Sequence, residues 1–196
     1  TGRGIMYTLL NLLEKTGKPG TGMSVAVQGF GNVGGIAAKL LAEKGFKVTA
    51  VGDVNGGLQK KEGLDIGAAL KHAAEHRTLK GYRESGAKEV SNREVLTADA
   101  DVLIPAAMEN QIDEDVAAAI KAKIIVEAAN GPTTNAADEI LQKRGITLVP
   151  DILANAGGVV VSYFEWVQNE MAFMWEEDYI NANLEKVMKK AFDTVW

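Results

Sequence analysis

The sequence predicts an α/β domain with a mostly parallel sheet and helices on both of its faces. Short apolar runs of strand length alternate with amphipathic stretches of helical length along most of the 196 residues. A glycine-rich turn separates the first such run from the helix that follows it. Strands that alternate with helices pair in parallel through right-handed crossovers, so we expect a doubly wound sheet.

The order of elements follows from the same periodicity. Strands are predicted at 23–28, 47–52, 101–105, 124–129 and 146–151. Helices are predicted at 3–15, 32–44, 64–77, 91–97, 113–121, 134–144, 157–174 and 177–195. Residues 55–57 are predicted to form a turn, and 78–90 an irregular segment with a short strand near Val90. The last helix carries an apolar stripe that we expect to be buried, formed by Ile180, Leu184, Val187, Met188, Ala191, Phe192 and Val195.

Composition excludes several classes of function. The net charge of −5 argues against nucleic acid as a partner, and no apolar run is long enough to cross a membrane. The absence of cysteine rules out disulfides and zinc sites with thiolate ligands, and fits a reducing, cytoplasmic compartment. His72 and His76 have metal-binding spacing on a predicted helix but lack a third ligand, so no metal site is expected.

The segment after the first strand fits the pattern G-x-G-x-x-G, with glycines at Gly29, Gly31 and Gly34. In a Rossmann-type fold these glycines allow a sharp turn, close approach of a pyrophosphate, and tight helix packing. Asp53 ends the next strand, at about the 20-residue distance where a carboxylate meets the adenosine ribose. The alternative is a flexible turn in an unrelated α/β protein. The strand–turn–helix–strand context and the acid favour dinucleotide binding.

Asp53 also bears on the choice of dinucleotide. Its carboxylate would repel a 2′-phosphate, which favours NAD and leaves NADP as the alternative. Lys60 and Lys61 lie nearby in sequence and would soften that repulsion.

Several longer strings carry a family resemblance. They are TGRG at 1–4, VQGFGNVG at 27–34, LIPAAMENQI at 103–112, EAANGPTT at 127–134 and PDILANAGGVVVSYFEWVQN at 150–169. Together they resemble the coenzyme-binding domain of glutamate dehydrogenases, in the glutamate/leucine/phenylalanine/valine dehydrogenase superfamily, over nearly the whole chain. The SYFEW string is less typical of the leucine and phenylalanine branches. The resemblance implies NAD(P)-dependent oxidative deamination of L-glutamate to 2-oxoglutarate and ammonia by the full-length enzyme.

The resemblance also implies roles for individual residues. The pyrophosphate would lie against the turn at 29–33, Asp53 and Val54 would meet the adenosine ribose, and Thr1 would reach the carboxamide. Val159 and Ser162 would face the substrate. The complete set of implied cofactor-binding residues is Thr1, Gln28, Gly29, Phe30, Gly31, Asn32, Val33, Asp53, Val54, Ala106, Ala107, Asn130 and Asn155.

Residue-level reasoning leaves some of these roles open. Asn130 and Asn155 follow predicted strands, at the sheet edge where α/β proteins bind ligands. A plain turn at Asn130 and a helix N-cap at Asn155 are the alternatives. Without the resemblance, Ser162 would be an ordinary hydroxyl on a helix surface.

The catalytic lysine and aspartate of the family belong to an N-terminal substrate domain whose motifs are absent here. We therefore expect a single NAD(P)-binding domain over 1–196, part of a longer protein, with no catalytic residue of its own. It should bind coenzyme without turning over glutamate, and the full-length parent is expected to be a homo-oligomer, a hexamer by family. The alternatives are a coenzyme domain of a leucine, valine or phenylalanine dehydrogenase, and a non-catalytic NAD-binding module.

Overall fold

The computed structural model describes all 196 residues and has one seven-stranded sheet of order β4-β3-β2-β1-β5-β6-β7. Five neighbouring strands are parallel; beyond β2, β3 pairs antiparallel with β2 and β4 pairs antiparallel with β3. The bounds are β1 Ser24–Gln28, β2 Lys47–Asp53, β3 Gly56–Gln59, β4 Lys88–Val90, β5 Val102–Pro105, β6 Ile124–Val126 and β7 Thr147–Val149.

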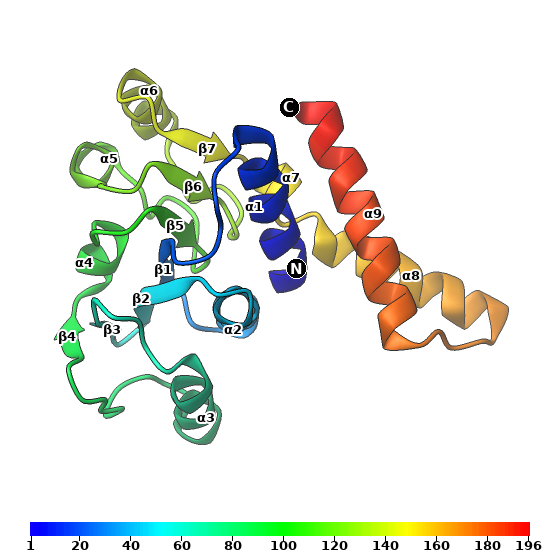
Figure 1. Cartoon of the computed structure of the whole chain (residues 1–196), viewed down its shortest axis with the longest axis horizontal. Coiled ribbons are helices and arrows are strands. Elements are labelled where there is room, and N and C mark those ends of the chain that lie inside the picture. Colours follow the sequence, from blue (N-terminus) through cyan, green and yellow to red (C-terminus); the bar gives the residue numbers. More distant parts are fainter.

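Helices cover both faces of the sheet (Figure 1). One face packs against α1 Gly2–Thr16, α2 Asn32–Glu43, α3 Ile66–His76, α7 Asp151–Ala154, α8 Gly157–Met171 and α9 Glu177–Val195. The opposite face packs against α4 Asn92–Leu96, α5 Glu114–Ala119 and α6 Asn135–Lys143. Alternate residues along the central strands supply the two cores, as a sheet buried on both faces requires. The predicted doubly wound, Rossmann-type α/β fold is confirmed.

The region after β2 differs from the sequence prediction. Residues 55–57 were expected to form a turn, but Gly56 and Gly57 begin β3, which pairs antiparallel with β2. A side chain on Gly57 would overlap the Val51 carbonyl oxygen, so the glycine permits the close approach of the two strands. The short strand predicted near Val90 is present as β4.

The C-terminal helices also depart from expectation. Helix α8 ends at Met171, because Ala172 adopts a left-handed conformation with φ 49°, and the four-residue α7 was not predicted. In the predicted stripe of α9, only Leu184, Met188 and Phe192 are buried, and Ile180 and Ala191 are partly buried. Val187 and Val195 are 39% and 61% exposed, so the prediction that they are buried was wrong. The reason is that α8 and α9 project from the sheet as a helical hairpin, and α9 packs mainly on α1 (Figure 1).

The connectivity creates a crevice at one edge of the sheet. From β1 the chain builds β2, β3 and β4 on one side, then crosses back to place β5 on the other side of β1. The loops that follow β1 and β5 therefore lead away from each other and leave a crevice between them at the carboxyl ends of these strands. Doubly wound sheets bind ligands in this crevice. None of the helices is long and apolar enough to serve as a membrane span.

Replacing Phe192 by alanine should lower the free energy of unfolding by about 3–4 kcal/mol, because it empties a fully buried aromatic site between α9 and α1. Denaturant unfolding followed by circular dichroism measures the change. The matched control is Val187→Ala on the same helix, which should change the free energy of unfolding by less than about 1 kcal/mol because that side chain is partly exposed. Equal losses for both variants would contradict the described packing of α9.

Candidate functional site

The glycine turn after β1 is shaped by contact with the loop after β5. Gly29 has φ 98°, and a Cβ there would lie 2.6 Å from the Ala106 carbonyl carbon. A Cβ on Gly34 would overlap the Gly29 carbonyl oxygen, so the first turn of α2 sits directly on the end of β1. Both glycines are required by the protein's own packing.

Gly31 differs from those two glycines. Nothing lies within 4 Å of the position that its Cβ would occupy, and its backbone is in the ordinary extended region with φ −84°. The missing side chain is therefore not needed by the fold, and it leaves open space directly above the backbone. A group that must approach this backbone closely would make use of that space.

Helix α2 begins beside this space. It starts at Asn32, its N-cap is Gly31, and no side chain accepts a hydrogen bond from its first turn. The first N–H groups of a helix have no partner within the helix and carry a partial positive charge. The open space therefore faces free donors, which suits an anion such as a phosphate.

Two adjoining cavities at this edge contain all of the predicted site residues. The first has a volume of about 680 Å³ and the second about 920 Å³, and both are lined by Ala106, Ala107 and Met108. The predicted residues that line only the first are Gln28, Gly29, Phe30, Gly31, Asn32, Asp53 and Val54. Those that line only the second are Thr1, Val33, Asn130, Asn155, Val159 and Ser162. The side chains of Gln28 and Phe30 are buried, whereas Val54 and Val159 are exposed.

Asp53 already has hydrogen-bond partners within the chain. Its Oδ1 accepts the Asn55 amide at 2.7 Å, and its Oδ2 accepts the Thr78 hydroxyl at 2.7 Å and the Leu79 amide at 2.5 Å. A carboxylate has about four acceptor positions, so one remains for a ligand. Asp53 thus fixes the loop after α3 as well as facing the cavity.

That loop brings in two residues that sequence reasoning missed. Arg77 and Thr78 line the first cavity, and Arg77 forms neither a salt bridge nor a side-chain hydrogen bond. Lys60, which was expected to soften the charge of Asp53, is instead paired with Glu84 at 2.6 Å. No sequence signal marked Arg77, because its proximity to Asp53 depends on how α3 returns to the sheet.

The second cavity is bordered by a pair of amide side chains. Asn155 Nδ2 donates to Asn130 Oδ1 at 2.7 Å, which joins the loops that follow β6 and β7. The remaining N–H groups and the Asn155 oxygen are left for a ligand. Ser162, on the first turns of α8, is exposed at the rim, and the Thr1 hydroxyl lies against Gly158.

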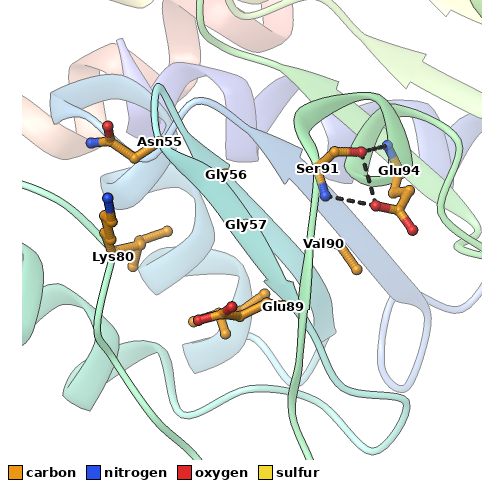
Figure 2. A pocket seen from close by; sticks show the side chains of 10 residues that line it. Asn55, Gly56, Gly57, Lys80, Glu89, Val90, Ser91 and Glu94 are labelled. Atoms are coloured by element: carbon orange, nitrogen blue, oxygen red, sulfur yellow. Dashed lines mark hydrogen bonds between the residues drawn. The ribbon is translucent and has the colours of Figure 1, made fainter.

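A third, smaller cavity of about 290 Å³ lies beside β3 and β4 and contains none of the predicted residues. Figure 2 shows Asn55 and Lys80 on one side of it and Ser91 and Glu94 on the other. Glu94 Oε2 accepts hydrogen bonds from the Ser91 amide at 2.7 Å and the Ser91 hydroxyl at 2.8 Å, in the capping box of α4. This carboxylate therefore caps a helix.

The two histidines on α3 are occupied with each other and with the backbone. Their rings stack with centroids 4.1 Å apart, His72 Nε2 lies 3.2 Å from the Lys80 carbonyl oxygen, and His76 Nδ1 lies 3.0 Å from the His72 carbonyl oxygen. No group of three or more histidine, aspartate or glutamate side chains is arranged to hold a metal ion.

Comparison with known proteins identifies the family. The model for glutamate/leucine/phenylalanine/valine dehydrogenases matches residues 1–196. The chain belongs to this dehydrogenase family. An NADP-specific glutamate dehydrogenase A1 from Halobacterium salinarum is 48% identical over the whole chain, which covers 46% of that protein.

Solved structures of family members agree with the fold. The hetero-hexameric glutamate dehydrogenase of Thermus thermophilus superposes with a TM-score of 0.92 at 32% identity, covering 99% of this chain and 45% of that one. The glutamate dehydrogenase of Peptoniphilus asaccharolyticus superposes with a TM-score of 0.80 at 36% identity, covering 98% and 44%. The chain thus spans less than half the length of these dehydrogenases.

The contrast between two glycines of this dehydrogenase fold gives a prediction about stability. Gly34→Ala should lower the free energy of unfolding by about 2 kcal/mol or more, because the new methyl group collides with backbone. Gly31→Ala should change it by less than about 1 kcal/mol, because the site is open and the backbone suits alanine. Thermal and urea unfolding of both variants measure the difference, and a reversed order would contradict the geometry of the turn.

Proposed function

We propose that residues 1–196 form the coenzyme-binding domain of a glutamate dehydrogenase and bind a nicotinamide dinucleotide. The full-length enzyme would oxidise L-glutamate to 2-oxoglutarate and ammonia. The observation that carries this proposal is the open space above Gly31, which faces the uncapped first turn of α2. The crevice at the carboxyl ends of β1 and β5 is also the place where this fold class binds dinucleotides.

The two cavities suit the two ends of such a coenzyme. The pyrophosphate would lie at the turn of residues 29–33, between the cavities, where the donors of α2 are free. The first cavity would take the adenosine, with Asp53 and Val54 at its ribose and Ala106 and Ala107 along its side. The second would take the nicotinamide ribose and ring, with Asn130, Asn155 and Thr1 as polar partners, and with Val159 and Ser162 facing the substrate.

The coenzyme would supply the hydride acceptor, and this chain would bind and orient it. Hydride transfer needs the substrate held against the nicotinamide with reacting atoms roughly 3–3.5 Å apart. The second cavity is a wide, one-sided depression bordered by α8, so it offers one wall of such a site. We infer that the groups acting on the substrate belong to the part of the enzyme outside these residues, and that this chain alone turns over no glutamate.

Two observations favour glutamate and a hexamer over the alternatives within the family. The relatives described above are named glutamate dehydrogenases, and the one from Thermus thermophilus is described as hetero-hexameric. Tyr163, Trp166 and Tyr179 are each more than half exposed, and exposed large aromatic side chains are common in contact regions between subunits. For the full-length protein we propose a hexamer; identical subunits are an expectation from the family resemblance and do not follow from this hetero-hexameric relative.

The choice of coenzyme is proposed to include NADP. Arg77 lines the adenosine cavity without an acidic partner, and an arginine fork suits a phosphate group. The relative at 48% identity is named NADP-specific. Asp53, which alone would favour NAD, has its charge shared among Asn55, Thr78 and Leu79.

Titration of the purified chain with NAD and NADP separately tests the proposal. We expect saturable binding of at least one coenzyme, and at least tenfold weaker binding by Gly31→Ala, whose methyl group occupies the phosphate space while leaving the fold intact. Isothermal titration calorimetry gives both values. Wild-type protein that binds neither coenzyme, or that binds unchanged after Gly31→Ala, would refute the proposal. Glutamate-dependent formation of reduced coenzyme by the chain alone would refute the inferred lack of turnover.

Substitution of Arg77 tests the choice of coenzyme. Arg77→Ala should weaken NADP binding about tenfold, the effect of losing a charged hydrogen bond to phosphate, and should change NAD binding less than about twofold. The control is Arg83→Ala, which removes a neighbouring exposed arginine that pairs with Glu89 and does not line this cavity. Equal losses for NAD and NADP would show that Arg77 does not read the 2′-phosphate.

A further inference from the structure

Glu127 is the only charged residue among the buried residues of the chain, at 6% exposure. It follows β6, at the same edge of the sheet as the two cavities, and lines neither of them. It forms no salt bridge. Burying an ionised carboxylate without a cation beside it costs free energy, so the fold keeps Glu127 at the expense of stability.

The backbone around Glu127 is held on both sides. The Glu127 amide donates to the Val149 carbonyl at the end of β7 at 3.1 Å. The next two amides, of Ala128 and Ala129, both donate to the Pro105 carbonyl at the end of β5, at 3.0 and 2.9 Å. Glu127 therefore projects from a rigid position between two strands.

Its side chain holds the loop after β7. Glu127 Oε2 accepts the backbone amide of Asp151 at 3.1 Å. Asp151 Oδ2 in turn accepts the backbone amide of Gly131 at 2.8 Å, across to the loop after β6. These two hydrogen bonds tie the loops after β6 and β7 to the end of β6.

Each of these loops carries one member of the amide pair at the second cavity. Asn130 directly precedes Gly131, and Asn155 follows α7, the helix that Asp151 begins. The pair is joined by a single hydrogen bond of 2.7 Å, and both side chains line the cavity. The spacing of the two amides therefore depends on the tether that starts at Glu127.

The charges around Glu127 are unfavourable for an ionised carboxyl group. Burial raises the pKa of Glu127, and Asp151 on α7 and Asp138 on α6 raise it further. The Asp151 amide and the Thr133 hydroxyl lower the pKa in part, although the hydroxyl lacks a well-formed hydrogen bond to the carboxylate. A neutral glutamine of the same shape would avoid this cost.

We propose that Glu127 is a positioning residue, whose carboxylate holds the paired amides of Asn130 and Asn155 in place at the nicotinamide end of the coenzyme site. The inference rests on the proposed coenzyme binding. A charged acceptor holds an amide about twice as strongly as a neutral one, so the ionised form fixes the loop most firmly. Burial of the ionised carboxylate therefore lowers the free energy of unfolding, whereas the loop that it holds in place strengthens coenzyme binding.

The sign of the effect on stability follows from linkage. The folded chain holds the Glu127 proton more tightly than the unfolded chain, so the ionised group lowers the free energy of unfolding. That cost is present above the raised pKa of the folded state and is absent below the ordinary value of 4.5. At neutral pH, Glu127→Gln should therefore unfold no more easily than wild type.

The test is titration of wild type, Glu127→Gln and Glu127→Ala with NADP, or with NAD if that coenzyme binds more tightly, from neutral to mildly acidic pH. At neutral pH we expect about threefold weaker binding for glutamine and about tenfold for alanine. The difference between wild type and glutamine should disappear as Glu127 becomes protonated. In wild type without coenzyme, the Asp151 and Gly131 amide resonances should titrate with the raised pKa, and in Glu127→Gln they should not.

The matched control is Glu139→Gln, an exposed carboxylate on the neighbouring α6, which should behave as wild type. Wild type that binds coenzyme with the same affinity as both Glu127 variants would overturn the inference and leave the proposed function standing. Wild type that binds no coenzyme at all would overturn the proposed function, and the inference with it. If Glu127→Ala does not fold, Glu127→Gln alone tests the inference. Parallel losses of stability and coenzyme affinity in Glu127→Gln would overturn it, because they would show that Glu127 has a purely structural role.

Discussion

The close approach of two backbone turns is the constraint on which this site depends. The chain leaves β1 at Gly29 so near the Ala106 carbonyl that no side chain fits between them. This contact joins the loops on either side of the point where the strand order reverses, and it places the first residues of α2, with their free donors, beside both cavities. Without it, the two cavities would not share a wall.

Two acidic residues act at opposite ends of this edge in a similar way. Asp53 accepts donors from the loop after α3, and Glu127 accepts the amide that begins the loop after β7. Each carboxylate comes at or just after the end of a strand, where the backbone is fixed. Asp53 holds a loop that has no regular structure of its own, and Glu127 holds the first residue of the short helix α7. The loops thereby gain a defined position from the sheet, which a binding site built on loops requires.

The sequence allowed most of this to be predicted, for physical reasons that differ between elements. Apolar periodicity revealed the central strands and the long helices because both faces of the sheet are buried. Periodicity did not reveal β3, because Gly56 and Gly57 have no side chains to show a pattern. It predicted too much burial for Val187 and Val195, because the pattern along a helix does not show which elements cover that helix. The glycine turn was recognisable from its spacing. Arg77 and the tether of Glu127 depend on contacts between distant loops, which spacing along the chain does not reveal.

The exposure of α8 gives a physical reason for the proposed separation of coenzyme binding from catalysis. Val159 and Ser162 border the second cavity on its open side, and Tyr163 and Trp166 continue the exposed surface along the same helix. A coenzyme bound as proposed would lie with its pyrophosphate against residues 29–33, whereas the outer face of its nicotinamide would meet solvent at the open second cavity. Water at that face would weaken every electrostatic interaction with a substrate. Closing the cavity therefore needs a second wall, and the apolar surface of α8 is where such a wall would be most strongly stabilised by burial.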